Sequence, residues 1–235
     1  MKGSAGQTME AIVLAGGMGT RLASVIQGIP KVLAPVGNQP FLELLLRRLR
    51  QKGMRRVILS VGYMAGMVRE RMGEQFEGLE LAYAVEDRPL GTGGGTLKAL
   101  SLARSDSVFV LNGDTFVDVD YAAMLSRHLD LGAKASIAVV DVPDCARYGR
   151  ILMRKDRVAG FAEKGQPGPG LISAGTYVMN RDIFESYGMP AAFSLESDFF
   201  VPHIGQLCPL AFVTSGYFID IGIPEDLARA QMELK

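Results

Sequence analysis

The chain has 235 residues, of which 48% are hydrophobic, and its 25 basic and 25 acidic side chains give a formal net charge of zero. This length and hydrophobic content suffice to bury a substantial core as one domain. The balanced charge argues against nucleic acid or an anionic membrane surface as the main partner, so a small ligand is expected.

Residues 1–8 contain lysine, glycine and serine but no apolar signal-peptide core. No apolar run elsewhere approaches the ~20 residues that a membrane span needs. We therefore expect a cytoplasmic protein without a membrane partner. Residues 1–8 are expected to be disordered or to derive from an expression vector, and residues 9–235 to form a single domain.

Strand-like apolar runs alternate with helical patterns through the first half of the chain. The expected strands are residues 10–14, 57–61, 79–85 and 107–111, and the expected helices are residues 41–52, 64–73, 92–103 and 121–131. Such alternation predicts an α/β fold with a doubly wound, Rossmann-like mixed sheet. Ligands of these sheets lie beyond the carboxyl ends of the strands, near the point where strand order reverses.

The second half is richer in strand-like segments and predicts a substrate lobe. Strands are expected at residues 135–140, 150–153, 157–163 and 171–179, with a glycine- and proline-rich loop at 165–170. Helical patterns return at residues 181–187, 197–204 and 225–234, the last of which is expected to pack back on the core. We thus divide the domain into a core, residues 9–133, and a lobe, residues 134–235.

A glycine-rich turn, LAGGMGTRL at residues 14–22, directly follows the first expected strand. Successive glycines let backbone N–H groups converge on phosphate oxygens, and Arg21 and Lys31 supply positive charge. The spacing fits neither the dinucleotide fingerprint G-x-G-x-x-G nor the P-loop. The turn therefore indicates a triphosphate cradle, with a structural turn that binds nothing as the alternative.

The cysteines and histidines carry no recognisable chemistry. Cys145 and Cys208 show neither metal-binding spacing nor a nucleophile signature, and His128 and His203 are isolated. We expect all four to be structural.

Several short motifs follow one another in a characteristic order. They are GGMGTR at residues 16–21, PK at 30–31, PLGTGG at 89–94, NGD at 112–114, EK at 163–164 and DIGIP at 220–224. With them, the chain resembles the sugar-1-phosphate nucleotidylyltransferases from about residue 10 to about residue 231. FSLESDF at 193–199 and YFIDIGIPED at 217–226 are most similar to the D-glycero-D-manno-heptose 1-phosphate guanylyltransferases.

The resemblance implies transfer of a nucleoside monophosphate, with GMP favoured, from a nucleoside triphosphate to a sugar 1-phosphate, with the heptose favoured. Pyrophosphate leaves and a nucleoside diphosphate sugar forms. Two polyanions must meet, so the site requires a divalent cation, Mg²⁺, and cationic side chains. Asp114 and Asp220 are the implied metal ligands, although a lone aspartate is more often a cap or turn residue. Residues 9–133 then form a nucleotide-binding core and residues 134–235 a sugar-binding lobe with a C-terminal helix.

The resemblance also assigns roles to individual residues. The catalytic residues are Arg21, Lys31 and Asp114. The nucleotide-binding residues are Leu14, Ala15, Gly16, Gly17, Gly19, Thr20, Arg21, Glu86, Gly91, Thr92, Asn112 and Gly113. The residues for the sugar phosphate are Tyr148, Gly149, Glu163, Lys164, Ser173 and Glu196, of which Lys164 holds the phosphate and Glu163 accepts hydrogen bonds from sugar hydroxyls.

Glu86 bears on the choice of nucleobase. A carboxylate accepts from both N1–H and N2–H₂ of guanine, whereas uracil or thymine offers a single N3–H. This chemistry favours GTP, with a solvent-facing Glu86 beside Asp87 and Arg88 as the alternative. Uridylyl-type relatives also carry acidic residues near this point.

The chain departs from the family pattern at Ser173, where many relatives have asparagine in the sequence Asn-Ala-Gly-Ile-Tyr. The sugar is therefore the least determined part of the prediction. Mannose 1-phosphate guanylyltransferases and uridylyl-, thymidylyl- or cytidylyltransferases are alternatives within the enzyme class. A non-catalytic subunit that senses sugar nucleotides is the alternative from another class. The sequence does not decide whether the protein forms a homo-oligomer, because the periodicity of apolar residues is the same for a helix face in a subunit interface and for one in the core.

Overall fold

The computed structural model describes residues 8–17, 19–22 and 25–234. Its strands are β1 (Met9–Leu14), β2 (Pro35–Val36), β3 (Gln39–Pro40), β4 (Met54–Val61), β5 (Gln75–Phe76), β6 (Leu79–Val85), β7 (Ser107–Asn112), β8 (Thr115–Val117), β9 (Ala135–Val142), β10 (Ile151–Arg154), β11 (Arg157–Phe161), β12 (Gly170–Asn180), β13 (Leu210–Thr214) and β14 (Phe218–Asp220). The prediction for residues 1–8 falls, apart from Thr8, outside the described residues.

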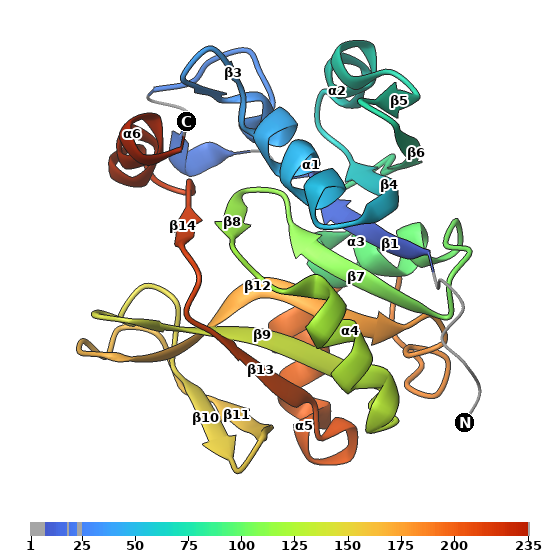
Figure 1. Cartoon of the computed structure of the whole chain (residues 1–235), viewed down its shortest axis with the longest axis vertical. Coiled ribbons are helices and arrows are strands. Elements are labelled where there is room, and N and C mark those ends of the chain that lie inside the picture. The colour runs from blue at the N-terminus through green and yellow to red at the C-terminus, as the bar shows by residue number, and fades with distance from the viewer. Residues whose placement is uncertain (1–7, 18, 23–24, 235) are drawn as a thin grey trace.

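One large mixed sheet runs through the molecule in the order β10-β11-β13-β9-β12-β7-β1-β4-β6-β5 (Figure 1). β1 pairs in parallel with β4 on one side and with β7 on the other, and β4 pairs in parallel with β6. The chain therefore winds outward from β1 through β4 to β6 and returns to β7, so strand order reverses between β1 and β7. This confirms the predicted doubly wound mixed sheet.

Helices cover both faces of this sheet. They are α1 (Phe41–Gln51), α2 (Ala65–Met72), α3 (Gly91–Leu100), α4 (Tyr121–Asp130), α5 (Val201–Leu207) and α6 (Pro224–Glu233). Alternation along β1 divides the apolar side chains: Ala11 and Val13 pack with α1, α2 and α4, whereas Ile12 packs with α3 and α5. Alternate residues of β1 therefore face opposite sides of the sheet, and the helices on each side complete one apolar layer there.

The expected helix at residues 181–187 is wrong. The segment forms consecutive tight turns, in which Ile183 N–H donates to the Asn180 carbonyl at 3.0 Å and Tyr187 N–H to the Phe184 carbonyl at 3.1 Å. Ile183 and Phe184 are buried, so the apolar pattern correctly indicated buried side chains although the backbone is not helical. These hydrogen bonds join residues i and i−3, as in successive turns, and Gly188, with a φ of 58°, ends the segment before Pro190.

The expected helix at residues 197–204 consists of two windings. A π-helical segment at Leu195–Phe200 leads into α5, which has Pro202 in its first turn. Proline lacks an N–H and is tolerated at the start of an α-helix, so the change of winding immediately before it has a local cause.

A third apolar cluster attaches the C-terminal helix. Leu227 and Ala230 of α6 pack with Phe41 of α1, with Ile219 of β14 and with Leu22. This agrees with the expected packing of the last helix against the rest of the chain. Among the described residues, no helix is both long enough and apolar enough to cross a membrane.

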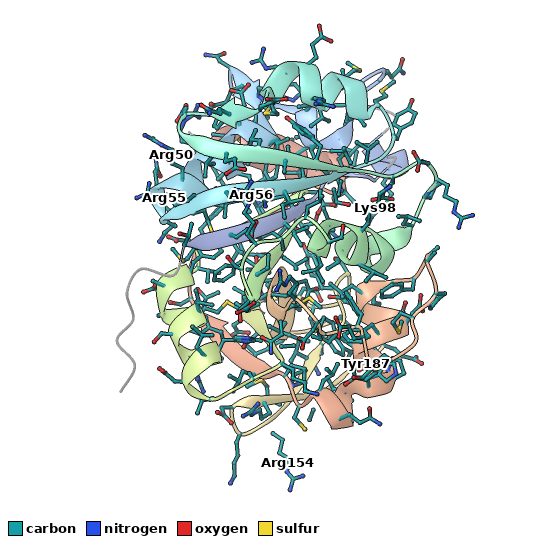
Figure 2. The ribbon with its side chains drawn as sticks, turned by 90° about the vertical axis from the view of Figure 1, so that its right-hand side faces the viewer. Arg50, Arg55, Arg56, Lys98, Arg154 and Tyr187 are labelled. Atoms are coloured by element: carbon teal, nitrogen blue, oxygen red, sulfur yellow. The ribbon has the colours of Figure 1, made fainter. Side chains whose placement is uncertain are left out.

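A buried ion pair lies at the amino-terminal end of the parallel strands. Glu10 on β1 is 2% exposed and accepts from the Arg56 guanidinium of β4. Its second oxygen accepts the backbone N–H groups of Arg104 and Ser105 at 2.8 and 2.9 Å. Arg56 also pairs with Glu80, whose side chain is 45% exposed, and is labelled in Figure 2. The whole network lies at the opposite strand ends from the glycine-rich turn.

His128 on α4 is a satisfied core residue, as expected. It is 1% exposed, and its two ring nitrogens lie 2.9 Å from Ser136 Oγ and 3.0 Å from Asn180 Oδ1. The amide oxygen only accepts, so Nε2 carries a hydrogen and donates to it, while the Ser136 hydroxyl is able to donate to Nδ1 or to accept from it. Burial lowers the pKa of His128 from its ordinary value of 6.5, against the hydrogen bond to Asn180, which raises it.

This histidine is expected to make stability depend on pH. The unfolded chain takes up a proton near pH 6.5 more readily than the folded protein, so the contribution of His128 is complete above about pH 6.5 and is lost as the pH falls below it. Urea unfolding at pH 7.5 and 5.5 measures the change. The fall in unfolding free energy should be larger for the wild type than for His128→Gln, and equal falls would contradict the assignment.

Candidate functional site

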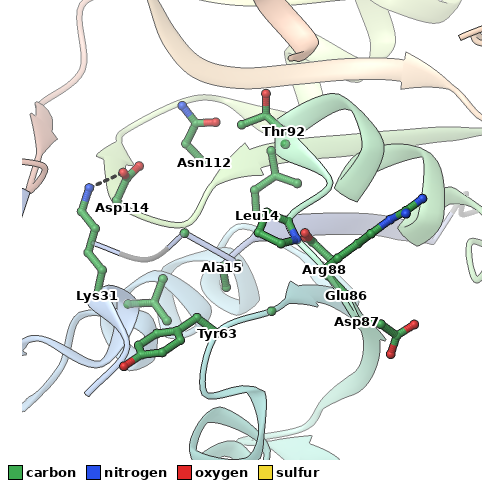
Figure 3. Close-up of a pocket in the computed structure, with 16 residues that line it drawn as sticks. Leu14, Ala15, Lys31, Tyr63, Glu86, Asp87, Arg88, Thr92, Asn112 and Asp114 are labelled. Atoms are coloured by element: carbon green, nitrogen blue, oxygen red, sulfur yellow. Dashed lines mark hydrogen bonds and ion pairs between the residues drawn. The ribbon is translucent and has the colours of Figure 1, made fainter. Parts of the chain in front are cut away.

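A pocket of about 610 Å³ opens at the carboxyl ends of β1, β4 and β7, at the point where strand order reverses. It is lined by Leu14, Ala15, Gly16, Gly17, Lys31, Val32, Gly62, Tyr63, Glu86, Asp87, Arg88, Pro89, Gly91, Thr92, Asn112 and Asp114. Figure 3 shows Lys31 and Asp114 together at one end and Glu86, Asp87 and Arg88 at the other. The fold therefore brings together residues from four of the motifs picked out in the sequence.

The glycine-rich turn forms one wall of the pocket only in part. Gly16 and Gly17 line it. Gly19 lies behind Lys31 and has a positive φ of 62°. Its Cβ position, the point where a Cβ would lie if the glycine had one, is 3.1 Å from the lysine Cβ. Arg21 is exposed on a short 3₁₀ turn and is not among the lining residues. The side chain of Thr20 lies outside the described residues. The structure thus places Lys31, and not Arg21, at the pocket wall.

Lys31 and Asp114 form an ion pair at one end of the pocket. The lysine Nζ lies 2.5 Å from Asp114 Oδ2, and the two side chains are 10% and 31% exposed. Asp114 follows β7 through Gly113, whose N–H donates to the Leu14 carbonyl at 2.9 Å. A side chain at residue 113 would lie 2.5 Å from that carbonyl oxygen, so glycine is required for β1 and the Asp114 turn to approach.

Asp220 is not among the residues that line the pocket, but strand pairing brings it beside Asp114. β14 runs antiparallel to β8 with Asp220 opposite Thr115, and Ile221 N–H donates to the Asp114 carbonyl at 2.9 Å. Gly222 N–H donates to Asp220 Oδ1 at 2.7 Å. Burial raises the pKa of Asp220 and the negative charge of Asp114 raises it further, against the lowering effect of Lys31. The carboxylates of Asp114 and Asp220 therefore repel each other in one partly buried site, where nearby positive charge stabilises them.

The donor set fits a hard divalent cation. The carboxylates of Asp114, in the turn between β7 and β8, and of Asp220, at the end of β14, lie close together here. Mg²⁺ takes oxygen ligands while keeping several waters. Among the described residues no group of three or more acidic, histidine or cysteine side chains forms a metal cage. A cation held by Asp114 and Asp220 would thus depend on water or phosphate oxygens for its other ligands.

Arg147, which the sequence did not single out, lies beside the acidic pair. Its guanidinium is 3.6 Å from Asp220 Oδ2, forms an ion pair with the buried Asp226 of α6, and lies 5.0 Å from the centre of the Tyr148 ring. Tyr148 in turn packs edge-on against Phe218, two residues before Asp220. Arg147, the residue before Tyr148 and Gly149, therefore links this part of the lobe to Asp220, which lies beside Asp114.

Glu86 is turned inward, and the solvent-facing alternative is wrong. Its Oε1 accepts from Ser60 Oγ at 3.1 Å and its Oε2 from Leu90 N–H at 3.0 Å. Side chains at Gly16 and Gly95 would approach Oε1 to 2.8 and 2.9 Å, so both glycines leave room for the carboxylate. Glu86 thereby fixes the loop before α3 while remaining part of the pocket wall.

The glycines that begin α3 make room for a distant segment. At Gly93 a Cβ would lie 2.2 Å from the Phe193 ring, and at Gly91 2.6 Å from the Phe193 carbonyl oxygen. Thr92 Oγ1 accepts Leu195 N–H at 2.9 Å. The PLGTGG motif therefore packs the segment before the π-helical turn against the start of α3, where Gly91 and Thr92 line the pocket.

The residues expected to bind the sugar phosphate lie outside the pocket lining and form two groups. In the first, the Cβ position of Gly149 is 3.5 Å from Lys164 Cγ, next to Tyr148, while Glu163 and Lys164 are exposed. In the second, the hydroxyl of buried Tyr177 donates to Glu196 at 2.7 Å and lies 3.1 Å from Ser173 Oγ. This second group approaches the pocket where the Cβ position of Gly175 is 2.6 Å from Asn112 Nδ2.

Gly62 and Tyr63 are lining residues that the sequence reasoning missed. They directly follow β4, so the rule that ligands gather at strand carboxyl ends points to them. Tyr63 is 51% exposed at the pocket wall.

Comparison with known proteins places this geometry in a family. The family model described as nucleotidyl transferase matches residues 10–235. The chain is 40% identical over 227 residues to a D-glycero-alpha-D-manno-heptose 1-phosphate guanylyltransferase of Aneurinibacillus thermoaerophilus, covering 97% of this chain and 99% of the relative. A protein of the same name from Campylobacter jejuni is 38% identical, with 93% and 96% covered.

Solved structures give the same result. The crystal structure of HddC from Yersinia pseudotuberculosis, 36% identical, covers 97% of this chain and 100% of its own with a TM-score of 0.86. HddC in complex with GMP-PN matches with a TM-score of 0.85. The resemblance read from the motifs and the predicted fold class are both confirmed. This chain belongs to the nucleotidyl transferase family.

Proposed function

We propose that the protein transfers GMP from GTP to D-glycero-α-D-manno-heptose 1-phosphate, releasing pyrophosphate and forming GDP-heptose. The observation that carries this proposal is the pocket itself, with Lys31 and Asp114 at one end and the Glu86 carboxylate at the other. Such a pocket suits a molecule with a polyanion at one end and a base at the other. Relatives named for this reaction, and a related structure in complex with GMP-PN, support the choice.

In the proposed reaction a phosphate oxygen of the sugar 1-phosphate attacks the α-phosphorus of GTP. A new P–O bond forms as the bond to pyrophosphate breaks, and no general base is needed because the attacking phosphate is already ionised. Lys31 and Arg21 bind the triphosphate and neutralise charge on the leaving pyrophosphate. The backbone of residues 14–17, 19 and 20 and of Gly113, with Asn112, Gly91 and Thr92, positions the nucleotide.

We propose Asp114 and Asp220 as the residues that hold Mg²⁺, which would offset the repulsion between the two polyanions. The sugar phosphate binds to Lys164, with its hydroxyls near Glu163, Glu196 and Ser173 and its ring beside Tyr148 and Gly149. Residues 9–133 accordingly serve the nucleotide and residues 134–235 the sugar. We place the reaction in the cytoplasm, where GTP is available, without nucleic acid or membrane as partner.

Glu86 is proposed to select guanine by accepting from N1–H and N2–H₂. Replacement by glutamine tests this cleanly, because a glutamine amide is able to accept from Leu90 N–H and donate to Ser60 Oγ, so the loop contacts survive. A bond to a charged acceptor is lost, so the ratio of kcat/KM for GTP to that for UTP should fall about tenfold or more.

The control for this substitution is Ser60→Ala, which removes one loop contact but keeps the carboxylate. It should leave the GTP/UTP ratio unchanged. Unchanged selectivity in Glu86→Gln, measured by steady-state kinetics with both nucleotides, would refute the role of Glu86 in base choice.

The function as a whole is tested by pyrophosphate release with Mg²⁺. GTP, UTP, dTTP, CTP and ATP are crossed against heptose, mannose and glucose 1-phosphates. Turnover confined to GTP with the heptose phosphate is the expected result. Preference for another pair would overturn the proposed specificity, and product binding without turnover for any pair would overturn the assignment as an enzyme in favour of a sensing subunit.

A further inference from the structure

Lys31 lies where a cation is needed even before any ligand binds. Its Nζ is 2.5 Å from Asp114 Oδ2 and 3.3 Å from the Cβ position of Gly222, and that same position is 2.7 Å from Asp220 Oδ1. The ammonium and both carboxylates therefore surround one small volume. The lysine side chain is only 10% exposed, so bulk water screens this charge poorly.

The same lysine is proposed above to bind the triphosphate, and it carries a single positive charge. An ammonium that is paired with Asp114 interacts less strongly with a phosphate. A divalent cation seeking Asp114 and Asp220 meets a positive charge already in place. Nucleotide binding thus requires the ammonium of Lys31 at the phosphates, and metal binding requires the same ammonium to leave Asp114.

The main chain around Lys31 limits how it can move. The residue opens a short 3₁₀ turn, Lys31–Leu33, behind Pro30, and its Cβ packs at 3.1 Å from the Cβ position of Gly19 in the glycine-rich turn. The stem is therefore held near the phosphate side of the pocket. Any movement of the ammonium away from the carboxylates would therefore come from rotation of its outer side-chain bonds.

We propose that Lys31 is an internal counter-ion that occupies the cation position between Asp114 and Asp220 until a nucleotide draws its ammonium away. Metal and nucleotide then bind interdependently, and free divalent cation binds weakly to the empty enzyme. This inference rests on the proposed function for the identity of the ligands, but its central test uses no nucleotide.

The test is Mn²⁺ binding, followed by the electron paramagnetic resonance signal of the free ion, in the absence of nucleotide. Lys31→Met removes a unit charge a few ångströms from both carboxylates, so its Mn²⁺ affinity should exceed that of the wild type by at least about tenfold. Turnover should fall in the same variant. Adding a non-hydrolysable GTP analogue should raise Mn²⁺ affinity less in Lys31→Met than in the wild type.

The matched control is Lys52→Met, which removes an equal charge from the Lys52–Asp118 pair, 2.8 Å apart and outside the pocket. Its Mn²⁺ affinity should equal that of the wild type. Adding Asp114→Asn to Lys31→Met should abolish the gain. Lys31→Gln repeats the comparison should the methionine variant fold poorly, and Mn²⁺ should raise the melting temperature of the Lys31 variants more than that of the wild type.

A folded Lys31 variant that binds Mn²⁺ no more tightly than the wild type would overturn the counter-ion role. Failure of the proposed function is a separate result: the nucleotide-free comparison stands even if the substrate panel reveals another nucleotide or sugar.

Discussion

Replacement of Asp114 by asparagine is expected to lower kcat by about a hundredfold or more, the scale seen when one group that stabilises developing charge is removed. The physical reason is that the Asp114 carboxylate pairs with Lys31 and lies near Asp220, so the neutral amide would lose charge at the end of the pocket where we propose that the triphosphate and Mg²⁺ bind. The measurement is pyrophosphate release at saturating GTP, sugar phosphate and Mg²⁺.

Asp118→Asn is the matched control for this prediction. Asp118 lies four residues along the same segment and pairs with Arg48 and Lys52 at 2.6 and 2.8 Å, outside the pocket. Its loss should affect stability slightly and turnover not at all. Turnover of Asp114→Asn within a few-fold of the wild type would remove Asp114 from the catalytic machinery.

Replacement of Glu10 by glutamine is expected to cost about 3–5 kcal/mol of unfolding free energy, because one partner of a buried ion pair is neutralised while the other stays buried. Glu10 accepts from Arg56 and from two backbone N–H groups. An amide has only one acceptor oxygen, so either the guanidinium or the two N–H groups must face its NH₂. Urea unfolding at pH 7.5 measures the loss.

Glu80→Gln provides the comparison, since Glu80 pairs with the same Arg56 but has a side chain that is 45% exposed. An exposed pair contributes at most about 1 kcal/mol, so this variant should stay close to the wild type. Equal losses for the two variants would show that burial does not govern the energetics of this network. Because the pair lies at the opposite strand ends from the pocket, both variants should keep the wild-type KM values.

The strand ends that surround the pocket were predictable from the sequence. β1 and β7 are apolar runs bounded by glycine or polar residues, and parallel strands place their carboxyl ends on one edge. Glu86 was correctly expected near this edge, whereas its inward bonds to Ser60 and Leu90 were not. Those bonds depend on how the loop before α3 folds over β4, which no local pattern records.

Some local patterns were misleading because packing overrode them. Ile183, Phe184 and Tyr187 have the spacing of one helix face, yet their segment turns tightly. Phe184 and Tyr187 pack edge-on against Phe199 of the π-helical segment. The resemblance led us to expect Gly91 and Thr92, at the start of α3, beside the nucleotide, and both line the pocket. In the structure, Gly93 and Gly94 pack against Phe193 and Ala191 of a distant segment.

The sequence by itself determined the alternation of strands and helices, the doubly wound fold and the glycine-rich turn, because hydrophobic period and turn chemistry act between residues that are near neighbours in the chain. Only the tertiary structure joined Asp220 to Asp114, through the pairing of β14 with β8, and brought Arg147 to their side. Contacts of this kind form between distant segments once the core has packed. Their geometry follows from the arrangement of the whole sheet and is absent from any single stretch of sequence.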